Sequence, residues 1–371
     1  MKFYVEKRNI LKNLKKIQDI TEKNPIIPIT SHMLIEAKGK SIIISATNFE
    51  VGMVVKHSAE VEREGRIVLD ARKIYEIIKE MPEGKICMAK KDQGWIEISY
   101  DNKIIFNIAG LLEEEFPQID VNSKINFFDI NKKNIYELIR NTIYAASDDK
   151  MRDTLRGVLL EKQERGLRMV ATDGHRLALA DRIFSNGEEK MMQKSVIIPQ
   201  KGAKEIKRFA EELKKEERIK IGFGENNVVV KGKEEIIVIR LIEGEFPNYK
   251  RAIPQNNKNI IILKTNDLNE SLHRVALIIN EDIKTVKLEL KKDLLIISSK
   301  KIGFGEAREE REIKYSGDEI EIGLNSRYIL DVLNTFEGEE VRLEMLDEKT
   351  PILIKEKDSN YNIAVIMPMT L

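Results

Sequence analysis

The sequence predicts an α+β protein made of three similar domains, and three observations support that prediction. First, Glu-Phe-Pro-Gln at 115–118 returns as Glu-Phe-Pro-Asn at 245–248, which is 130 residues later. Second, six segments have apolar residues at helical spacing. Third, short runs rich in β-branched residues lie between those segments. One repeat unit is therefore a strand, a helix and about three hairpin-linked strands, and six units pair into three domains.

The six helical segments recur at regular intervals. They open near Lys7, Arg72, Lys132, Lys201, Asp267 and Ser326, which are 59 to 69 residues apart. The first presents Ile10, Leu14 and Ile17 as a narrow apolar stripe, and the other five are similar. A stripe of this width packs on one side and leaves the other side in water. We expect two helices per domain to cover one face of antiparallel sheets, with domains at 1–122, 123–252 and 253–371.

The runs between the helices are typical of strands joined by tight turns. Examples are 41–45, 95–99, 227–231 and 294–298. A second pentapeptide, Ile-Gly-Phe-Gly-Glu, occurs at 221–225 and again at 302–306, but this offset of 81 fits neither repeat period. Since β-like runs flank both copies, we interpret their glycines as strand ends rather than as a phosphate-binding loop.

Composition excludes several classes of protein. The 371 residues include 63 basic and 62 acidic side chains, which rules out a wholly basic nucleic-acid coat but not a basic face balanced by an acidic one. Cys87 is the single cysteine, so no intramolecular disulfide can form. The four histidines are far apart and lack metal-ligand spacing, so we expect no metal and no cofactor. No apolar run reaches 18 residues, and we expect a soluble, cytoplasmic protein.

Positive charge is concentrated in the predicted helices. Their formal charges add up to +7, of which residues 7–19 supply +4, so the remainder of the chain totals −6. Basic helices on an acidic body predict a binding face, whereas a simple distribution of charge over wet helix faces predicts none. Both interpretations fit the residues alone. Because no base-reading module is present, Lys and Arg on such a face would contact phosphates without reading sequence.

The segment Val-Ala-Thr-Asp-Gly-His-Arg-Leu-Ala at 170–178 is the densest motif. A hydrolase hypothesis makes Asp173 the group that orients His175 as a general base, but the sequence offers neither a nucleophile elbow nor a second carboxylate at useful spacing. Asp-Gly between apolar runs is a turn signal, which favours a polar loop between strands. A repeat scaffold that binds only proteins is a third possibility.

The last nine residues, 363–371, are apolar to the end of the sequence. Met and Pro there indicate either core packing or an adaptable apolar groove for a partner. Periodicity alone favours core packing.

Three segments together resemble one family. Ala-Thr-Asp-Gly-His-Arg-Leu-Ala at 171–178, Phe-Pro-Asn-Tyr at 246–249 and the Met-Pro-Met ending are similar to the bacterial DNA polymerase III beta subunit, the sliding clamps. The resemblance implies a head-to-tail dimeric ring that encircles double-stranded DNA, with twelve helices lining its hole. It also implies a protein that is no enzyme. The implied partners are the polymerase III alpha subunit, the clamp loader, repair polymerases, ligase and mismatch-repair proteins.

The resemblance also implies site residues, which include a peptide-binding cleft between the second and third domains. That cleft would be lined by Leu155, Thr172, Gly174, His175, Arg176, Leu177, Pro247, Arg251, Val365, Ile366, Met367, Pro368, Met369 and Leu371. The DNA-contacting cations would be Lys23, Arg72, Lys73, Arg152 and Lys201. The dimer interface would include Phe106 and Ile108 on one side and Leu277 and Ile278 on the other.

Some positions depart from the family pattern. Asn24 and Thr370 stand where relatives often have a basic residue. Asp148, Asp149 and Asp153 occupy a loop in which relatives often contact DNA, and carboxylates there would repel phosphate.

Overall fold

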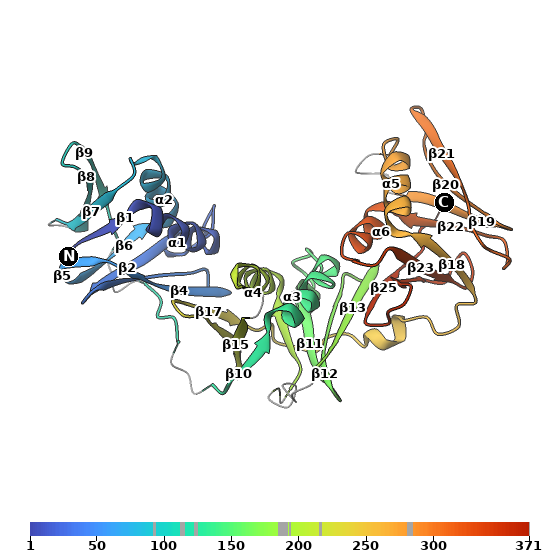
Figure 1. The fold of residues 1–371 in the computed structure, drawn as a ribbon, viewed down its shortest axis with the longest axis horizontal. Helices are drawn as coiled ribbons and strands as arrows, with labels where there is room; N and C mark the ends of the chain where they lie inside the picture. Colours follow the sequence, from blue (N-terminus) through green and yellow to red (C-terminus); the bar gives the residue numbers. More distant parts are fainter. Residues whose placement is uncertain are drawn as a thin grey trace. The chain divides into compact units, whose positions relative to one another are not determined.

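The computed structural model describes residues 1–91, 94–111, 116–121, 125–184, 192, 194–214, 217–279 and 285–370 (Figure 1). Strand, helix and three strands alternate six times along this chain. The predicted α+β class with three similar domains is confirmed. The expected boundary at 122/123 lies outside the described residues.

The first two repeat units form the N-terminal domain. Their elements are β1 (Lys2–Glu6), α1 (Lys7–Ile20), β2 (His32–Lys38), β3 (Ser41–Thr47), β4 (Val51–Ser58), an additional strand β5 (Glu60–Arg63), β6 (Gly65–Asp70), α2 (Ala71–Glu80), β7 (Lys85–Lys90), β8 (Trp95–Tyr100) and β9 (Ile104–Ala109).

The next two units follow the same order. They comprise β10 (Phe127–Asn131), α3 (Lys132–Arg140), β11 (Gly157–Gln163), β12 (Gly166–Thr172), β13 (Arg176–Ile183), β14 (Val196–Pro199), α4 (Gln200–Glu212), β15 (Arg218–Phe223), β16 (Asn227–Lys231) and β17 (Glu235–Arg240).

The last two units complete the chain. They comprise β18 (Asn259–Lys264), α5 (Thr265–Ala276), β19 (Thr285–Lys291), β20 (Leu294–Lys301), β21 (Gly305–Glu312), β22 (Ile320–Asn325), α6 (Ser326–Leu333), β23 (Glu340–Met345), β24 (Ile352–Glu356) and β25 (Asn362–Ile366).

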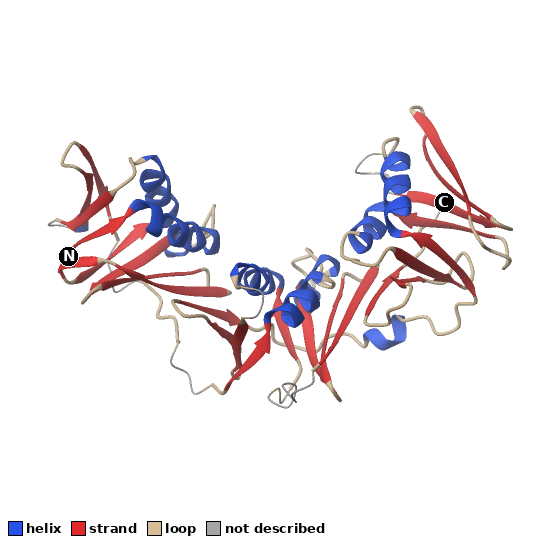
Figure 2. Cartoon of the chain, in the orientation of Figure 1, coloured by secondary structure: helices blue, strands red, loops and turns tan. Residues whose placement is uncertain are grey.

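Each helix begins where the first strand of its unit ends. At three of these junctions the last strand residue caps the helix: Asp70, Asn131 and Asn325 each accept a hydrogen bond from a backbone N–H in the first helical turn. Such side chains satisfy donors that have no partner inside the helix. The two helices of each domain pack against each other and against strands, as the blue helices beside the red strands of Figure 2 show.

The two units of a domain exchange their first strands. β1 pairs with β7 and β6 with β2, and the same reciprocal pairing recurs as β10 with β15, β14 with β11, β18 with β23 and β22 with β19. Each unit therefore lacks a complete sheet without its neighbour, so the domain is the smallest self-contained piece.

Two compact bodies make up the chain, Met1–Ile130 with Glu216–Leu241 and Asn131–Lys215 with Ile242–Leu371. In the first body, β17 adds to β4 and makes an eight-stranded sheet in the order β10-β15-β16-β17-β4-β3-β2-β6. In the second body, β13 adds to β25 and makes another, β14-β11-β12-β13-β25-β24-β23-β18. Continuous antiparallel sheets thus join neighbouring domains.

Buried apolar side chains fill each domain beneath its helices. The helical stripes that the sequence predicts are buried, with Ile10, Leu14 and Ile17 at most 2% exposed. Within the described residues, no helix is long and apolar enough to span a membrane, and no three His, Cys, Asp or Glu side chains are grouped as metal ligands.

Candidate functional site

The loop between β12 and β13 is closed by its own side chains. Asp173 Oδ1 accepts hydrogen bonds from the backbone N–H groups of His175 (2.8 Å) and Arg176 (2.9 Å). The Thr172 hydroxyl donates to the Arg176 carbonyl (2.6 Å) and accepts from the Gly174 N–H (3.1 Å). Gly174 has φ of +90°, which a residue with a Cβ rarely adopts. The motif is a structural turn, and Asp173 contacts backbone rather than the His175 ring, which argues against a general-base pair.

Arg176 is held between two carboxylates and two aromatic rings. Its Nε donates to Asp173 Oδ2 (3.0 Å) and its Nη1 to Asp331 Oδ2 (2.6 Å), which belongs to α6 of the third domain. The guanidinium lies 4.3 Å from the centroid of the Tyr328 ring and 5.6 Å from that of Tyr144. Burial raises the pKa of the Tyr144 hydroxyl well above its usual range. Since the Arg176 side chain is only 12% exposed, it braces β13 against α6.

An apolar cluster lies beneath this loop and draws on two domains. It contains Leu159, Val170, Leu177, Leu179, Ile197, Tyr249, Leu353 and Val365, with Ile242, Phe246, Ile253 and Ile363 packed at its margin. β11, β12 and β13 supply one part of the cluster, and β24 and β25 supply another. Leu155, 8% exposed, occupies the short 3-10 helix Asp153–Arg156. Pairing of β13 with β25 is what brings Leu177 opposite Val365.

Tyr249 fixes the turn that follows Phe-Pro-Asn. Its hydroxyl donates to the Glu161 carboxylate and accepts from Arg168 Nη1 (3.4 Å), while Arg168 forms two 2.7 Å hydrogen bonds with Asp181. Burial raises the pKa of Tyr249 to about 12. With Tyr249 anchored, Pro247 and Arg251 of the same turn remain exposed.

The C-terminal segment changes character at Met367. Val365 and Ile366 are buried in β25, and Ile366 belongs to the core of the third domain, as periodicity predicts. Met367 and Met369 are 41% and 40% exposed. The Met367 N–H donates to the His175 carbonyl (2.9 Å), and that of Met369 to the Gly323 carbonyl (2.8 Å). The tail therefore lies against the 172–176 loop with two adaptable apolar side chains outward. Leu371 lies outside the described residues.

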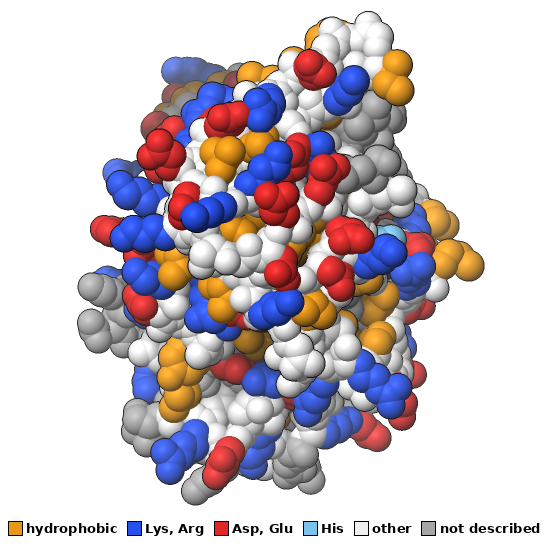
Figure 3. Space-filling model, turned by 90° about the vertical axis from the view of Figure 1, so that its right-hand side faces the viewer, with side chains coloured by type: hydrophobic (Ala, Val, Ile, Leu, Met, Phe, Trp, Pro, Cys, Tyr) orange, Lys and Arg blue, Asp and Glu red, His pale blue; other side chains and the backbone are white. Residues whose placement is uncertain are grey.

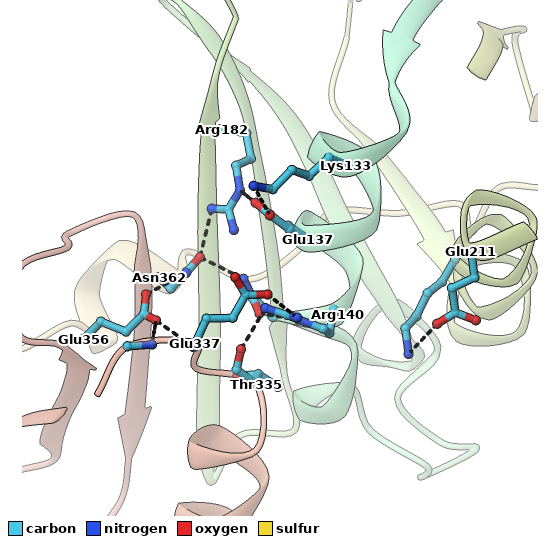
Figure 4. Close-up of polar contacts among 12 residues, drawn as sticks. Lys133, Glu137, Arg140, Arg182, Glu211, Thr335, Glu337, Glu356 and Asn362 are labelled. Carbon is cyan, nitrogen blue, oxygen red and sulfur yellow. Dashed lines mark hydrogen bonds and ion pairs between the residues drawn. The ribbon is translucent and has the colours of Figure 1, made fainter. Parts of the chain in front are cut away.

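A second polar cluster joins α3 to the third domain (Figure 4). Arg182 pairs with Glu137 (2.6 Å) and donates to Asn362 Oδ1 (2.9 Å). Arg140 pairs with Glu337 (2.6 Å), lowering the pKa of that carboxyl, and donates to the Thr335 carbonyl. These contacts border a cavity of about 440 Å³. Together with Arg176–Asp331, they hold the two sides of the candidate cleft as one body.

The predicted DNA-contacting cations differ in their surroundings. In the first body, Lys23 and Lys73 are exposed and Arg72 is half-buried. In the second body, exposed Arg152 lies 3.6 Å from Asp149 and donates to the Asp173 carbonyl (3.4 Å), and Lys201 is half-buried.

Charge counting from the sequence overstates the basic face of α1. Lys16 is buried in an ion pair with Glu235 of β17, and Lys7 donates to the Met81 carbonyl, so neither belongs to a fully exposed charge stripe. On the face seen in Figure 3, cations and anions are interspersed rather than segregated.

The predicted interface residues lie at the edges of two sheets. β9 ends the five-stranded sheet β5-β1-β7-β8-β9 in the first body, and Phe106 is 40% exposed there while Ile108 is half-buried. β21 ends the four-stranded sheet β21-β20-β19-β22 in the second body. Leu277, 79% exposed, and half-buried Ile278 follow α5 of the same domain.

The structure also identifies residues that sequence reasoning missed. Tyr144, Tyr328 and Asp331 surround Arg176, and Glu161 and Arg168 hold Tyr249. No local motif marks them, because they meet Arg176 or Tyr249 across separations of up to 155 residues.

Comparison with known proteins identifies the family. The chain matches the N-terminal, central and C-terminal domains of the DNA polymerase III beta subunit over residues 1–120, 129–248 and 250–370. It is 30% identical to the beta sliding clamp of Escherichia coli K12 and 29% identical to that of Pseudomonas aeruginosa, with all of each chain covered. Structures similar over the full length of both chains are the Pseudomonas aeruginosa beta subunit (29% identity, TM-score 0.90) and the Caulobacter crescentus sliding clamp (28%, 0.91). The chain therefore belongs to the family of bacterial DNA polymerase III beta subunits, the beta sliding clamps.

Proposed function

We propose that two copies of this sliding clamp close head to tail into a ring around double-stranded DNA and tether the replicative polymerase to it. The observation that supports this most directly is a repeated joint. Wherever two domains meet, the last strand of one repeat unit pairs antiparallel with the last strand of another: β4 with β17, and β13 with β25. Only β9 and β21 remain as last strands without such a partner within the described residues.

A second copy supplies the missing partner. β9 of one copy and β21 of the other form the same antiparallel joint, with Phe106 and Ile108 facing Leu277 and Ile278. Since the two surfaces differ, the contact is heterologous and must close into a ring or continue as a filament. Two chains of three domains make six joints, which closes the ring.

The cations Lys23, Arg72, Lys73, Arg152 and Lys201 then face the DNA, with the helices lining the hole. No base-reading element is needed, because phosphate contacts are independent of sequence and leave the ring free to move along the duplex. Topology rather than affinity keeps the ring on DNA, so a net charge of +1 suffices. The clamp itself makes and breaks no bond, and it acts in the cytoplasm.

Partners dock on the cleft above the two-domain apolar cluster. A short linear peptide places apolar side chains against Leu177, Val365, Met367 and Met369, while exposed Arg251 meets its acidic groups. Leu155, Thr172, Gly174, His175, Arg176, Pro247, Ile366, Pro368 and Leu371 complete or support this cleft. Methionine side chains adapt to several related peptides. The polymerase alpha subunit, the clamp loader, repair polymerases, ligase and mismatch-repair proteins would share it.

Retention on circular DNA tests the proposal. The clamp is loaded on nicked plasmid with a cognate clamp loader and ATP, separated by gel filtration in moderate salt, and the plasmid is then linearised. A sliding ring stays on the circle and leaves the linear form. Retention that linearisation does not change would mean phosphate binding without encirclement. No retention on either form, with the loader active on a control clamp, would refute the proposed function.

A further inference from the structure

The hairpin between β20 and β21 ends in two exposed apolar side chains. Ile302 is 92% exposed and Phe304 69%, on either side of Gly303, whose φ of +77° makes the turn. The Phe304 N–H donates to the Lys301 carbonyl (3.0 Å), and the Lys301 ammonium lies 5.3 Å from the Phe304 ring centroid. Exposed large apolar residues that cluster, rather than occur singly, mark interaction surfaces.

This tip is continuous with the proposed dimer interface. Gly305 opens β21 directly after Phe304, and a Cβ built on it would lie 4.0 Å from Ile278 Cδ1. Leu277, next to Ile278, is 79% exposed. The apolar surface thus runs from the end of α5 to the tip and then onto the free edge of β21, whose own residues are mostly charged.

The two internal joints indicate what lies opposite the tip. In both, the start of one strand pairs with the end of the other: Arg176 with Ile366, and Glu235 with Val55. The same arrangement places Gly305 beside Ala109, the last residue of β9. Ala109 pairs with Trp95 at the start of β8, and Trp95 is 45% exposed on the face opposite buried Ile96.

We propose that Ile302 and Phe304 of one copy dock on Trp95 of the second copy and extend the β9–β21 joint beyond its strands. This inference rests on the proposed head-to-tail ring. Burial of a Trp side chain by two apolar residues supplies an anchor of the kind that dominates protein interfaces. The committed occupant is therefore a second copy of this chain rather than another protein or a lipid surface.

Trp95 is the single tryptophan of the chain and reports on the contact directly. Its emission and acrylamide quenching are measured while the protein is diluted through the monomer–dimer transition, with mass followed by sedimentation. Dimer formation should shift the emission to shorter wavelength and lower the quenching constant. A dimer whose Trp95 is quenched as strongly as the monomer would overturn this inference and leave the ring intact. A protein that stays monomeric at every concentration would overturn both.

Variants separate the tip from the rest of the joint. The double variant Ile302→Ser/Phe304→Ser should weaken dimerisation about tenfold or more. It should also abolish the fluorescence change in the dimer that still forms. Ile26→Ser, at a 97% exposed position away from both edges, is the matched control and should behave as wild type. Trp95→Ala and Phe304→Ala should be non-additive in a double-mutant cycle. Additive effects, or an unchanged dimer constant in the tip variant, would overturn the inference.

Discussion

Asp331 offers a test of how the candidate cleft is built, because it lies on α6 and is not one of the expected peptide contacts. Its carboxylate receives Arg176 Nη1 at 2.6 Å, with the two side chains 29% and 12% exposed. Asp331→Asn keeps the shape and removes the charge. A hydrogen bond to a charged group contributes about 1.5–3 kcal/mol. Arg176 keeps its bond to Asp173 and its contact with Tyr328, so only part of that free energy reaches the cleft.

We therefore expect Asp331→Asn to weaken peptide binding by about three- to tenfold, since 1.4 kcal/mol corresponds to tenfold. The assay is fluorescence anisotropy with a labelled peptide that contains the clamp-binding segment of the polymerase. Arg176→Lys should lose at least as much, because an ammonium cannot reproduce the planar fork. Asp318→Asn is the control: its ion pair with Lys258 (2.7 Å) is exposed on both sides, and affinity should be unchanged.

Wild-type affinity in Asp331→Asn would refute this reasoning. If Arg176→Lys nonetheless lost binding, Arg176 would act by touching the peptide rather than by holding the loop. A loss in Asp318→Asn as large as in Asp331→Asn would instead indicate a general electrostatic effect of the third domain.

Three further predictions follow from the same structure. Lys16→Met leaves the Glu235 carboxylate buried without its cation and should destabilise the first body by about 3–5 kcal/mol in urea unfolding, whereas Lys16→Met/Glu235→Leu should recover most of the loss. Arg274 lowers the pKa of Glu309 to about 2 from an ordinary 4.5, so this carboxylate stabilises fully above pH 4.5 and loses its effect as the pH falls toward 2; the difference in Tm between wild type and Glu309→Gln should vanish over that range. Met367→Ala should abolish polymerase stimulation while the sedimentation of the dimer stays unchanged.

Local pattern was sufficient to predict the repeat units. The apolar stripe of Ile10, Leu14 and Ile17 is set by helical geometry, and it is buried as the spacing requires. The turn at Asp173 follows from short-range chemistry, since an Asp side chain bonds the backbone two and three residues on. Both features depend on neighbours within one or two turns of chain.

Long-range pairing was not predictable in the same way. Sequence pattern assigns strands but not their partners, so the exchange of first strands between units left no signal. Lys16 and Glu235 are 219 residues apart, and Arg176 and Asp331 are 155 apart. Each pair exists only because distant sheets place it together. The positive count of α1 erred for this reason, since Lys16 is one of its five cations.

The three kinds of joint differ in what must stabilise them. The β4–β17 and β13–β25 joints lie within one chain, so the tether keeps their strands at high effective concentration. The proposed β9–β21 joint connects two chains and must also offset about 4–15 kcal/mol of lost translational and rotational freedom. Strand pairing like that of the internal joints does not supply this excess. Apolar side chains beyond the strands can, and Ile302 and Phe304 stand at the end of β21 where such a contribution is needed.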